Sequence, residues 1–320
     1  MNIGAVGKLA LSFLVAVPLS ACVLGDHDEL DDSDEFELDE LDELDEEIGE
    51  TTQEVLTSNG MSINGMSING MSINGMSVNG MSINGMSING MSINGSQLSG
   101  VKSNGQAISG TGFVGALMTG TLTSGATVSL RVDSATTLAA PNSDVWAYGV
   151  SYQLAGTTTW SPMCGSSATL AVPLSGTWNL GSGVVGGGSW SSSSTKFTFG
   201  CRGAALAKCV ELGYKPWKYV NGASLRNHHQ ACTRMIRADY CGDGKAWTQD
   251  GTPINVYDSL NIQTDAAPYK LDAEWVPTGA RCIWKLRDFQ SGKPTCEALK
   301  KLEGCGTFKS GALLISEYKP

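Results

Sequence analysis

Two adjacent histidines and a following aspartate are the side chains best suited to acid/base chemistry. His228 and His229 precede Asp239 in one short stretch of the chain. A histidine oriented by a carboxylate is a common general base, because its ordinary pKa lies near neutral pH. The three residues give the hypothesis of a hydrolase acting on envelope glycans or peptides. Burial of all three would rule it out, since they would then only hydrogen-bond inside a core.

Nearby cysteines raise metal binding and nucleophilic catalysis as further hypotheses. Cys232 lies one helical turn after His228, and Cys241 follows, so imidazole and thiolate groups could share a face as zinc or copper ligands. A free thiolate could also be a nucleophile. Metal-binding pairs of the Cys-x2-Cys type are absent, and disulfides offer these cysteines another role. We therefore expect no metal and no cofactor in the folded body.

Cysteine usage favours disulfides. Eight of the nine cysteines lie beyond residue 160, and an even number in an exported chain favours complete pairing. They are Cys164, Cys201, Cys209, Cys232, Cys241, Cys282, Cys296 and Cys305. We expect Cys164 to pair with Cys201 and Cys296 with Cys305, and leave the other four unassigned.

Tryptophans suggest a binding surface. All eight lie beyond residue 145, and such flat, amphipathic rings suit the binding of glycans or peptides. They are Trp146, Trp160, Trp178, Trp190, Trp217, Trp247, Trp275 and Trp284. Exposure of three or more on one face would favour binding, and burial of all eight would exclude it.

Short strands and two helices must position these side chains. Strand-like runs occur at 144–154, 168–174, 195–201, 281–287 and 312–319, between turns rich in Gly and Ser. Helical patterns cover 204–213 and 223–241, the second with Ser224 as a candidate N-cap. Residues 129–320 therefore predict a disulfide-stapled, β-rich α+β domain.

A five-residue repeat precedes this domain. Gly occupies every fifth position from Gly60 to Gly125, although the repeated sequence "MSING" ends at Gly95. The glycine spacing continues after the other residues of the repeat have changed. This indicates a backbone turn at fixed intervals, because Gly reaches positive φ freely. An apolar residue usually stands two positions before each Gly and should face inward. Units such as "MSING" and "SQLSG" resemble the pentapeptide-repeat family, which implies a right-handed β-helix, or solenoid, over 58–128; the alternative is a disordered linker.

The N-terminus predicts export and membrane anchoring. Residues 1–21 resemble a signal peptide, and "LSAC" at 19–22 resembles the lipobox of bacterial lipoproteins, so Cys22 is the expected lipidation site. The 13-residue apolar run is too short to span a bilayer. Residues 22–57 hold 17 of the 31 acidic residues and predict a disordered stalk. We expect an outer-membrane lipoprotein, facing the periplasm or displayed on the cell surface.

Charge excludes one class of partner. Residues 51–320 carry 20 basic against 15 acidic residues, but the basic ones are scattered, so we expect no nucleic-acid binding.

The stretch "RADYCGDG" at 237–244, with "HHQACTRMI" and "KCVELGYKPW" upstream, resembles the ADYC-domain family of exported bacterial proteins, named for Ala238, Asp239, Tyr240 and Cys241. That resemblance implies no reaction. We expect a non-catalytic structural or binding protein with a glycan or protein ligand, and a hydrolase as the alternative.

Overall fold

The computed structural model describes residues 57–58, 73–77, 81–122, 124–287, 293–296 and 303–319. These residues all belong to one compact unit, 50–320. The expected signal peptide (1–21), the lipidation site Cys22 and the acidic stalk up to residue 56 lie outside the described residues.

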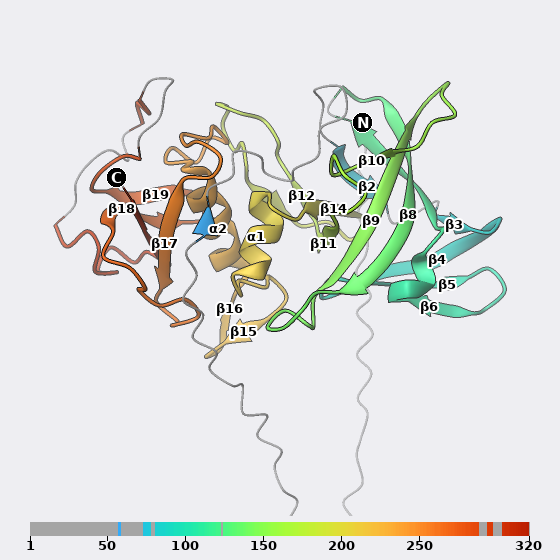
Figure 1. Ribbon diagram of the computed structural model, residues 1–320, viewed down its shortest axis with the longest axis horizontal. Helices are drawn as coiled ribbons and strands as arrows, with labels where there is room; N and C mark the ends of the chain where they lie inside the picture. Colours follow the sequence, from blue (N-terminus) through green and yellow to red (C-terminus); the bar gives the residue numbers. More distant parts are fainter. Residues whose placement is uncertain are drawn as a thin grey trace, which may run out of the picture. The chain divides into compact units, whose positions relative to one another are not determined.

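Antiparallel strands form the first and larger sheet (Figure 1). Its strands from the repeat tract are β2 (Ile73–Ser77), β3 (Ser82–Ile83), β4 (Met86–Asn94), β5 (Gln97–Lys102), β6 (Ala107–Ser109) and β7 (Leu117–Leu122). The strands that follow are β8 (Thr127–Thr137), β9 (Trp146–Leu154), β10 (Ser161–Pro162), β11 (Ala171–Ser175) and β14 (Lys196–Cys201).

Six of these strands close into a barrel. β7 pairs with β8, β8 with β9, β9 with β11, β11 with β14, β14 with β2, and β2 again with β7. Alternate side chains of the strands, such as Met118, Leu130, Val132 and Phe199, are buried in one apolar cluster. β2 comes from the repeat tract, so a repeat unit supplies one wall of the barrel.

The solenoid expected over 58–128 is wrong for the part of the tract that the structure describes. β3 pairs with β4, β4 with β5, and β5 with β6, all antiparallel, so the chain folds back in hairpins where a β-helix would coil. Every second glycine of the register, from Gly85 to Gly125, lies in a loop between two elements, whereas the glycines between them lie within an element. The structure therefore repeats once every two sequence units, and each pair of units forms one strand and one turn.

Asn-Gly pairs serve two purposes in these hairpins. Asn84 (φ 50°) and Gly85 (φ 76°) are the two loop residues between paired Ile83 and Met86, as in a type I′ turn. In β4 the pairing register shifts between Asn89 and Ser92, and Gly90 has a φ of 56°. This bulge returns successive repeats to the same face of the strand, because a period of five would otherwise alternate between faces.

The inward position two before Gly is confirmed in most of the described units, although Ile93 is only partly buried and Ser103 is exposed. Those at the position two before Gly that are buried are Ile83, Ile88, Leu98, Ile108, Phe113 and Met118. Met81 and Met91 are buried beside them, so Met acts as a core filler in these hairpins.

The expected boundary at 128/129 falls inside β8. β8 continues across it and pairs with both β7 and β9. The 3-10 helix η1 (Gly110–Phe113) also packs against β8, with Phe113 in the barrel core. Residues 81–128 therefore share a core with the following strands and are not a separate domain.

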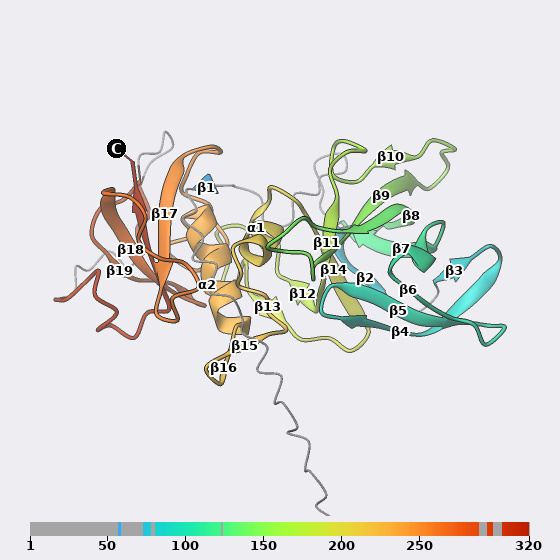
Figure 2. The ribbon, with the colours of Figure 1, turned by 60° about the horizontal axis from the view of Figure 1, so that its bottom comes forward.

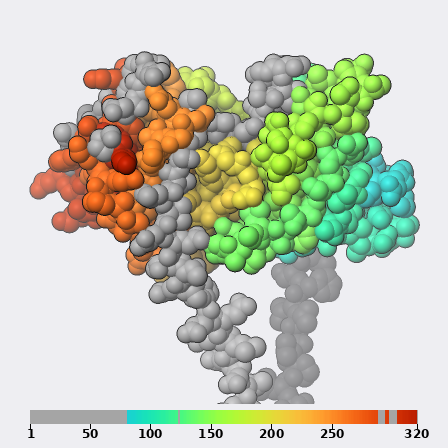
Figure 3. Space-filling view, in the orientation of Figure 1, coloured from blue at the N-terminus to red at the C-terminus, as the bar shows by residue number. Residues whose placement is uncertain are grey.

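Two helices lie between the barrel and the second sheet (Figures 1 and 2). α1 (Ala205–Glu211) packs on β14 and shares an apolar cluster with β9 and β11. α2 (Arg226–Arg237) packs on α1 and on strands of the second sheet. In Figure 3 the yellow surface of the α1 region separates green barrel residues from orange C-terminal ones.

The second sheet is antiparallel and has the order β1-β17-β20-β18-β19. Its strands are β1 (Thr57–Ser58), β17 (Pro253–Asp258), β18 (Lys270–Val276), β19 (Gly279–Ile283) and β20 (Leu314–Tyr318). Two small hairpins, β12 (Thr177–Trp178) with β13 (Trp190–Ser191) and β15 (Tyr219–Val220) with β16 (Ala223–Ser224), flank the helices. The expected β-rich, disulfide-stapled α+β class is confirmed for this part of the chain.

Four disulfides staple the chain. The expected pairing of Cys164 with Cys201 is present, whereas that of Cys296 with Cys305 is wrong. The remaining bonds are Cys209–Cys232, Cys241–Cys296 and Cys282–Cys305. Sequence spacing could not identify these partners, because tertiary folding brings Cys296 to the turn after α2 and Cys305 to β19.

Candidate functional site

The two histidines lie inside the protein. His229 is fully buried, its Nε2 lies 3.0 Å from the carbonyl oxygen of Leu206, and burial lowers its pKa to about 3. His228 is 4% exposed and stacks on Tyr214. Burial lowers its pKa too, against the opposing effects of Asp258 and the backbone of Ser224. Both imidazoles are therefore neutral at neutral pH.

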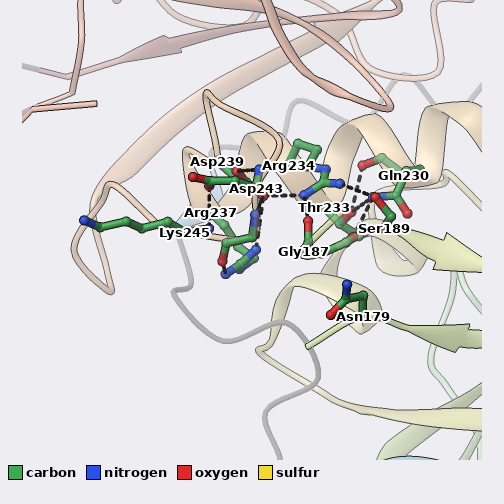
Figure 4. A network of polar contacts seen from close by, with 12 residues as sticks. Asn179, Gly187, Ser189, Gln230, Thr233, Arg234, Arg237, Asp239, Asp243 and Lys245 are labelled. Carbon is green, nitrogen blue, oxygen red and sulfur yellow. Dashed lines mark hydrogen bonds and ion pairs between the residues drawn. The ribbon is translucent and has the colours of Figure 1, made fainter. Parts of the chain in front are cut away.

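Asp239 is the centre of a buried polar network (Figure 4). Its carboxylate lies 2.5 Å from Nη1 of Arg234 and 3.4 Å from Nη1 of Arg237. It also accepts hydrogen bonds from the backbone N–H groups of Asp243 and Gly244. Burial raises the pKa of this carboxyl, and the two guanidinium groups oppose that effect. Its acceptor oxygens are already engaged, so they are not available to orient either histidine.

This network fastens a glycine-rich loop to α2. Arg234 donates to the carbonyl oxygen of Gly187, to Pro277 O and to Ser189 Oγ. A Cβ at Gly188 would lie 2.4 Å from Nη1 of Arg234, and one at Gly187 would lie 2.1 Å from Asp243 O. The loop backbone lies this close to the side chain of Arg234 and to the backbone of Asp243, so glycine is required at both positions.

The rest of the tetrapeptide 238–241 is structural as well. Ala238 ends α2 with a φ of 50°, and Cys241 is bonded to Cys296. The hydroxyl of buried Tyr240 donates to Asp272, whose other carboxylate oxygen lies 2.7 Å from Nε of buried Arg287. Tyr240 thus ties the turn after α2 to the second sheet.

The catalytic and metal hypotheses fail on these positions. His228, His229 and Asp239 are all buried, which is the condition that rules out the proposed acid/base set. Cys232 and Cys241 are in disulfides, so neither can be a thiolate ligand or nucleophile. Among the described residues no group of three or more His, Cys, Asp or Glu side chains could hold a metal ion.

The tryptophans do not form the expected exposed face. Trp178, Trp247 and Trp275 are buried, and only Trp284, at 51%, is exposed among the eight. The remaining four are partly buried: Trp146, Trp160, Trp190 and Trp217. Neither the condition for a broad aromatic surface nor the condition for excluding one is met.

One partly buried tryptophan does line a pocket. An open pocket of about 740 Å³ is lined by Ser175, Trp190, Ser192, Ser193, Ser194 and Arg226. The serines come from the end of β11 and from the loop between β13 and β14, and Arg226 is the first residue of α2. Strands and a helix thus bring distant parts of the sequence together around this pocket.

Trp190 is held firmly in the pocket wall. Its indole N–H donates to Ser175 O at 2.9 Å, and its backbone N–H donates to Oε1 of Gln230 at 3.1 Å. A Cβ at Gly176 would lie 2.3 Å from the indole nitrogen, so only glycine fits there. Gln230 lies one turn after Arg226 on α2, and the guanidinium carbon of Arg226 lies 4.2 Å above the indole ring. This wall is therefore preformed.

Arg226 has no counter-charge within the part of the chain that is described. Its Nη1 is buried and makes no hydrogen bond, and burial, with no carboxylate contributing, lowers its pKa to about 10. α2 begins with no side-chain cap and no acidic residue in its first turn, so the positive end of the helix dipole adds to this charge. Ser224, the expected N-cap, instead accepts the backbone N–H of Arg226 at 3.3 Å.

Sequence reasoning missed Arg226 and the serines as site residues. The available signal was a cation in the first turn of a predicted helix, where acidic residues are favoured. The serine run "SWSSSST" at 189–195 has the composition of a turn and carries no signal of a binding site.

Comparison with known proteins identifies one family. The model of the ADYC domain matches residues 110–288, which include η1, the barrel strands from β7 onward, both helices and the Asp239 network. Searches of the curated proteins and of the solved structures gave no match. Among the described residues, no helix is both long and apolar enough to cross a membrane.

Proposed function

This chain belongs to the ADYC-domain family, and we propose that it is a membrane-anchored, exported binding protein that catalyses no reaction. The observation that carries the proposal is the preformed pocket at Trp190 and Arg226, which is lined by serines and by a guanidinium with no anionic partner among the described residues, while every catalytic candidate is buried.

Hydrogen-bonding groups in the pocket support a role in binding. The side chains of Ser175, Ser192 and Ser194 form no hydrogen bond within the described part of the chain. Trp190, Gln230 and the Asp239 network keep the wall rigid beneath them. Preformed walls reduce the entropy lost on binding, so this geometry suits ligand recognition.

The N-terminus supports anchoring in a membrane. The lipobox-like sequence ending at Cys22 would carry the lipid, and the acidic residues 22–57 would hold the folded unit away from the lipid surface. We place the protein in the outer membrane, facing the periplasm or the exterior. Its partners are the membrane, through the lipid, and an envelope or extracellular glycan or protein; it binds no nucleic acid and needs no cofactor.

Blocking the pocket tests the binding function. The full chain is incubated with purified envelope fractions, and bound material is recovered by affinity capture. Ser192→Trp should fill the pocket and abolish capture, while Ser103→Trp, at an exposed turn outside the pocket, should leave it unchanged. Recovered ligand should be chemically intact. Equal capture by both variants, or turnover of the ligand by the protein, would contradict the proposal.

The anchor is tested separately. Cys22→Ala should move the protein from the membrane fraction to the soluble fraction and abolish incorporation of labelled fatty acid. Retention of both properties would contradict lipidation at this residue.

A further inference from the structure

We propose that the pocket at Trp190 and Arg226 binds a saccharide that carries a carboxylate, with the guanidinium of Arg226 as the group that pairs with the acid. This inference rests on the proposed binding function and adds the class of ligand. It follows from the charge, position and surroundings of Arg226.

Among the residues that the structure describes, Arg226 is a half-buried cation without an anionic partner. The other arginines inside the fold are paired: Arg234 and Arg237 with Asp239, and Arg287 with Asp272. By contrast, Nη1 of Arg226 is removed from solvent and makes no hydrogen bond. Leaving a buried guanidinium nitrogen unsatisfied is costly, and an anion in the pocket that pairs with this guanidinium would offset the cost.

Trp190 fixes the direction of the charge. The guanidinium carbon lies 4.2 Å above the indole ring, whose N–H donates to Ser175 O. The backbone N–H of Trp190 donates to Gln230, and the ring packs closely on Gly176. A guanidinium is planar and can donate two parallel hydrogen bonds to a carboxylate, so an arginine that lines the pocket above the indole suits a carboxylate ligand. A lysine in its place would lose this geometry.

The rest of the lining favours an acidic sugar over a phosphoryl group. Arg226 is the single cation among the pocket's lining residues, and the others apart from Trp190 are serines. A phosphate monoester carries nearly two charges and is usually met by several cations or backbone N–H groups. One guanidinium matches one carboxylate, and the hydroxyls of Ser175, Ser192 and Ser194, which form no hydrogen bond within the described part of the chain, can both donate to and accept from sugar hydroxyls.

Isothermal titration calorimetry on the full chain tests this inference. The probes are trigalacturonate, the neutral trisaccharide of galactose, and inorganic phosphate, each at low ionic strength. Trigalacturonate should bind, the neutral sugar should bind about tenfold or more weakly, and added salt should weaken only the acidic sugar. Phosphate should not displace trigalacturonate.

Arg131 provides a matched control. Its guanidinium also lies over an indole, 4.6 Å from the centre of the Trp160 ring, but it is paired with Asp133 at 2.6 Å. Arg226→Gln should weaken trigalacturonate binding by about ten- to a hundredfold, whereas Arg131→Gln should not. Arg226→Lys retains the charge but loses the planar guanidinium, so its affinity for trigalacturonate should lie between those of Arg226→Gln and the unmodified protein. This variant keeps the test usable if the glutamine variant folds poorly.

The outcomes separate this inference from the proposed function. Equal affinity for the acidic and neutral sugars, or stronger binding of phosphate, would overturn the carboxylate assignment while pocket binding stands. Absence of binding by all three probes, although Ser192→Trp abolishes envelope capture, would also overturn the assignment alone. Envelope capture unaffected by Ser192→Trp would overturn the proposed site and this inference together.

Discussion

Asp239 and Arg234 form an ion pair of 2.5 Å in which both side chains are buried, at 0% and 1% exposure. The aspartate belongs to the tetrapeptide that characterises the family, and the arginine belongs to α2. Through Arg234 the pair reaches Gly187, Ser189 and Pro277, so one buried carboxylate holds the turn after α2, the glycine-rich loop and the β18–β19 turn together. The family motif is thus a structural device.

Removal of this carboxylate should destabilise the fold strongly. Asp239→Asn removes the anion that Arg234 pairs with inside the fold, and breaking a buried pair in this way costs about 3 to 5 kcal/mol. Urea denaturation of the variant should show this loss in the free energy of unfolding. Asp243→Asn, whose amide oxygen can still accept the N–H of Lys245, is the control and should change stability little. Equal stability of the two variants would show that the pair is dispensable.

Acidification should destabilise the protein through His229. Its pKa is about 3 in the folded state against 6.5 for an unperturbed histidine, so the unfolded state binds more protons between these values. The contribution of neutral His229 to the free energy of unfolding is fully present above pH 6.5. It falls as the pH drops toward 3, by up to about 1.4 kcal/mol per pH unit. Chemical denaturation at pH 5 to 7 measures this slope.

The matching variant is His229→Gln, whose side-chain amide can still donate to Leu206 O. It should show a shallower dependence over this range, because His228, whose pKa is also lowered, still contributes. An unchanged slope would mean that His229 is not the titrating group.

Loss of the disulfide between the helices should weaken the helical layer. Cys209 and Cys232 join α1 to α2 across 23 residues, and a closed loop of this size stabilises by about 3 kcal/mol. The double variant Cys209→Ala/Cys232→Ala should lose that amount in denaturant unfolding. Addition of a reductant should destabilise the double variant by less than it destabilises the unmodified protein, and an equal effect would contradict the contribution of this bond.

The repeat tract should be sensitive to deletion more than to substitution. Deleting Gly90 removes the bulge residue and would turn Met91 and Ile93 to the opposite face of β4, which destabilises by several kcal/mol through loss of burial. Gly90→Ala retains the register and costs only about 1 to 2 kcal/mol for the positive φ, since no atom lies within 4 Å of the new Cβ. Thermal unfolding compares the two. Similar losses would exclude a bulge that sets the register.

Local patterns in the sequence determined several strands and both α-helices. The runs at 144–154 and 195–201 contain β9 and β14, the run at 168–174 covers all of β11 except Ser175, and 204–213 and 223–241 contain α1 and α2, because amphipathic periodicity and Gly/Ser turns act over a few residues. The inward position of the repeat was also evident, as buried Ile83 and Leu98 confirm. These features depend on nearest neighbours along the chain.

Only the tertiary structure decided how the repeats are used and where the site lies. A five-residue period is compatible with a coil or with bulged hairpins, and pairing of β2 with β7 and β14 selects the latter. The burial of His229, the partner of Cys296 and the missing counter-charge of Arg226 depend on segments far away in sequence. Residue types establish what each side chain can do, but burial and the identity of its neighbours, which arise only on folding, establish what it does.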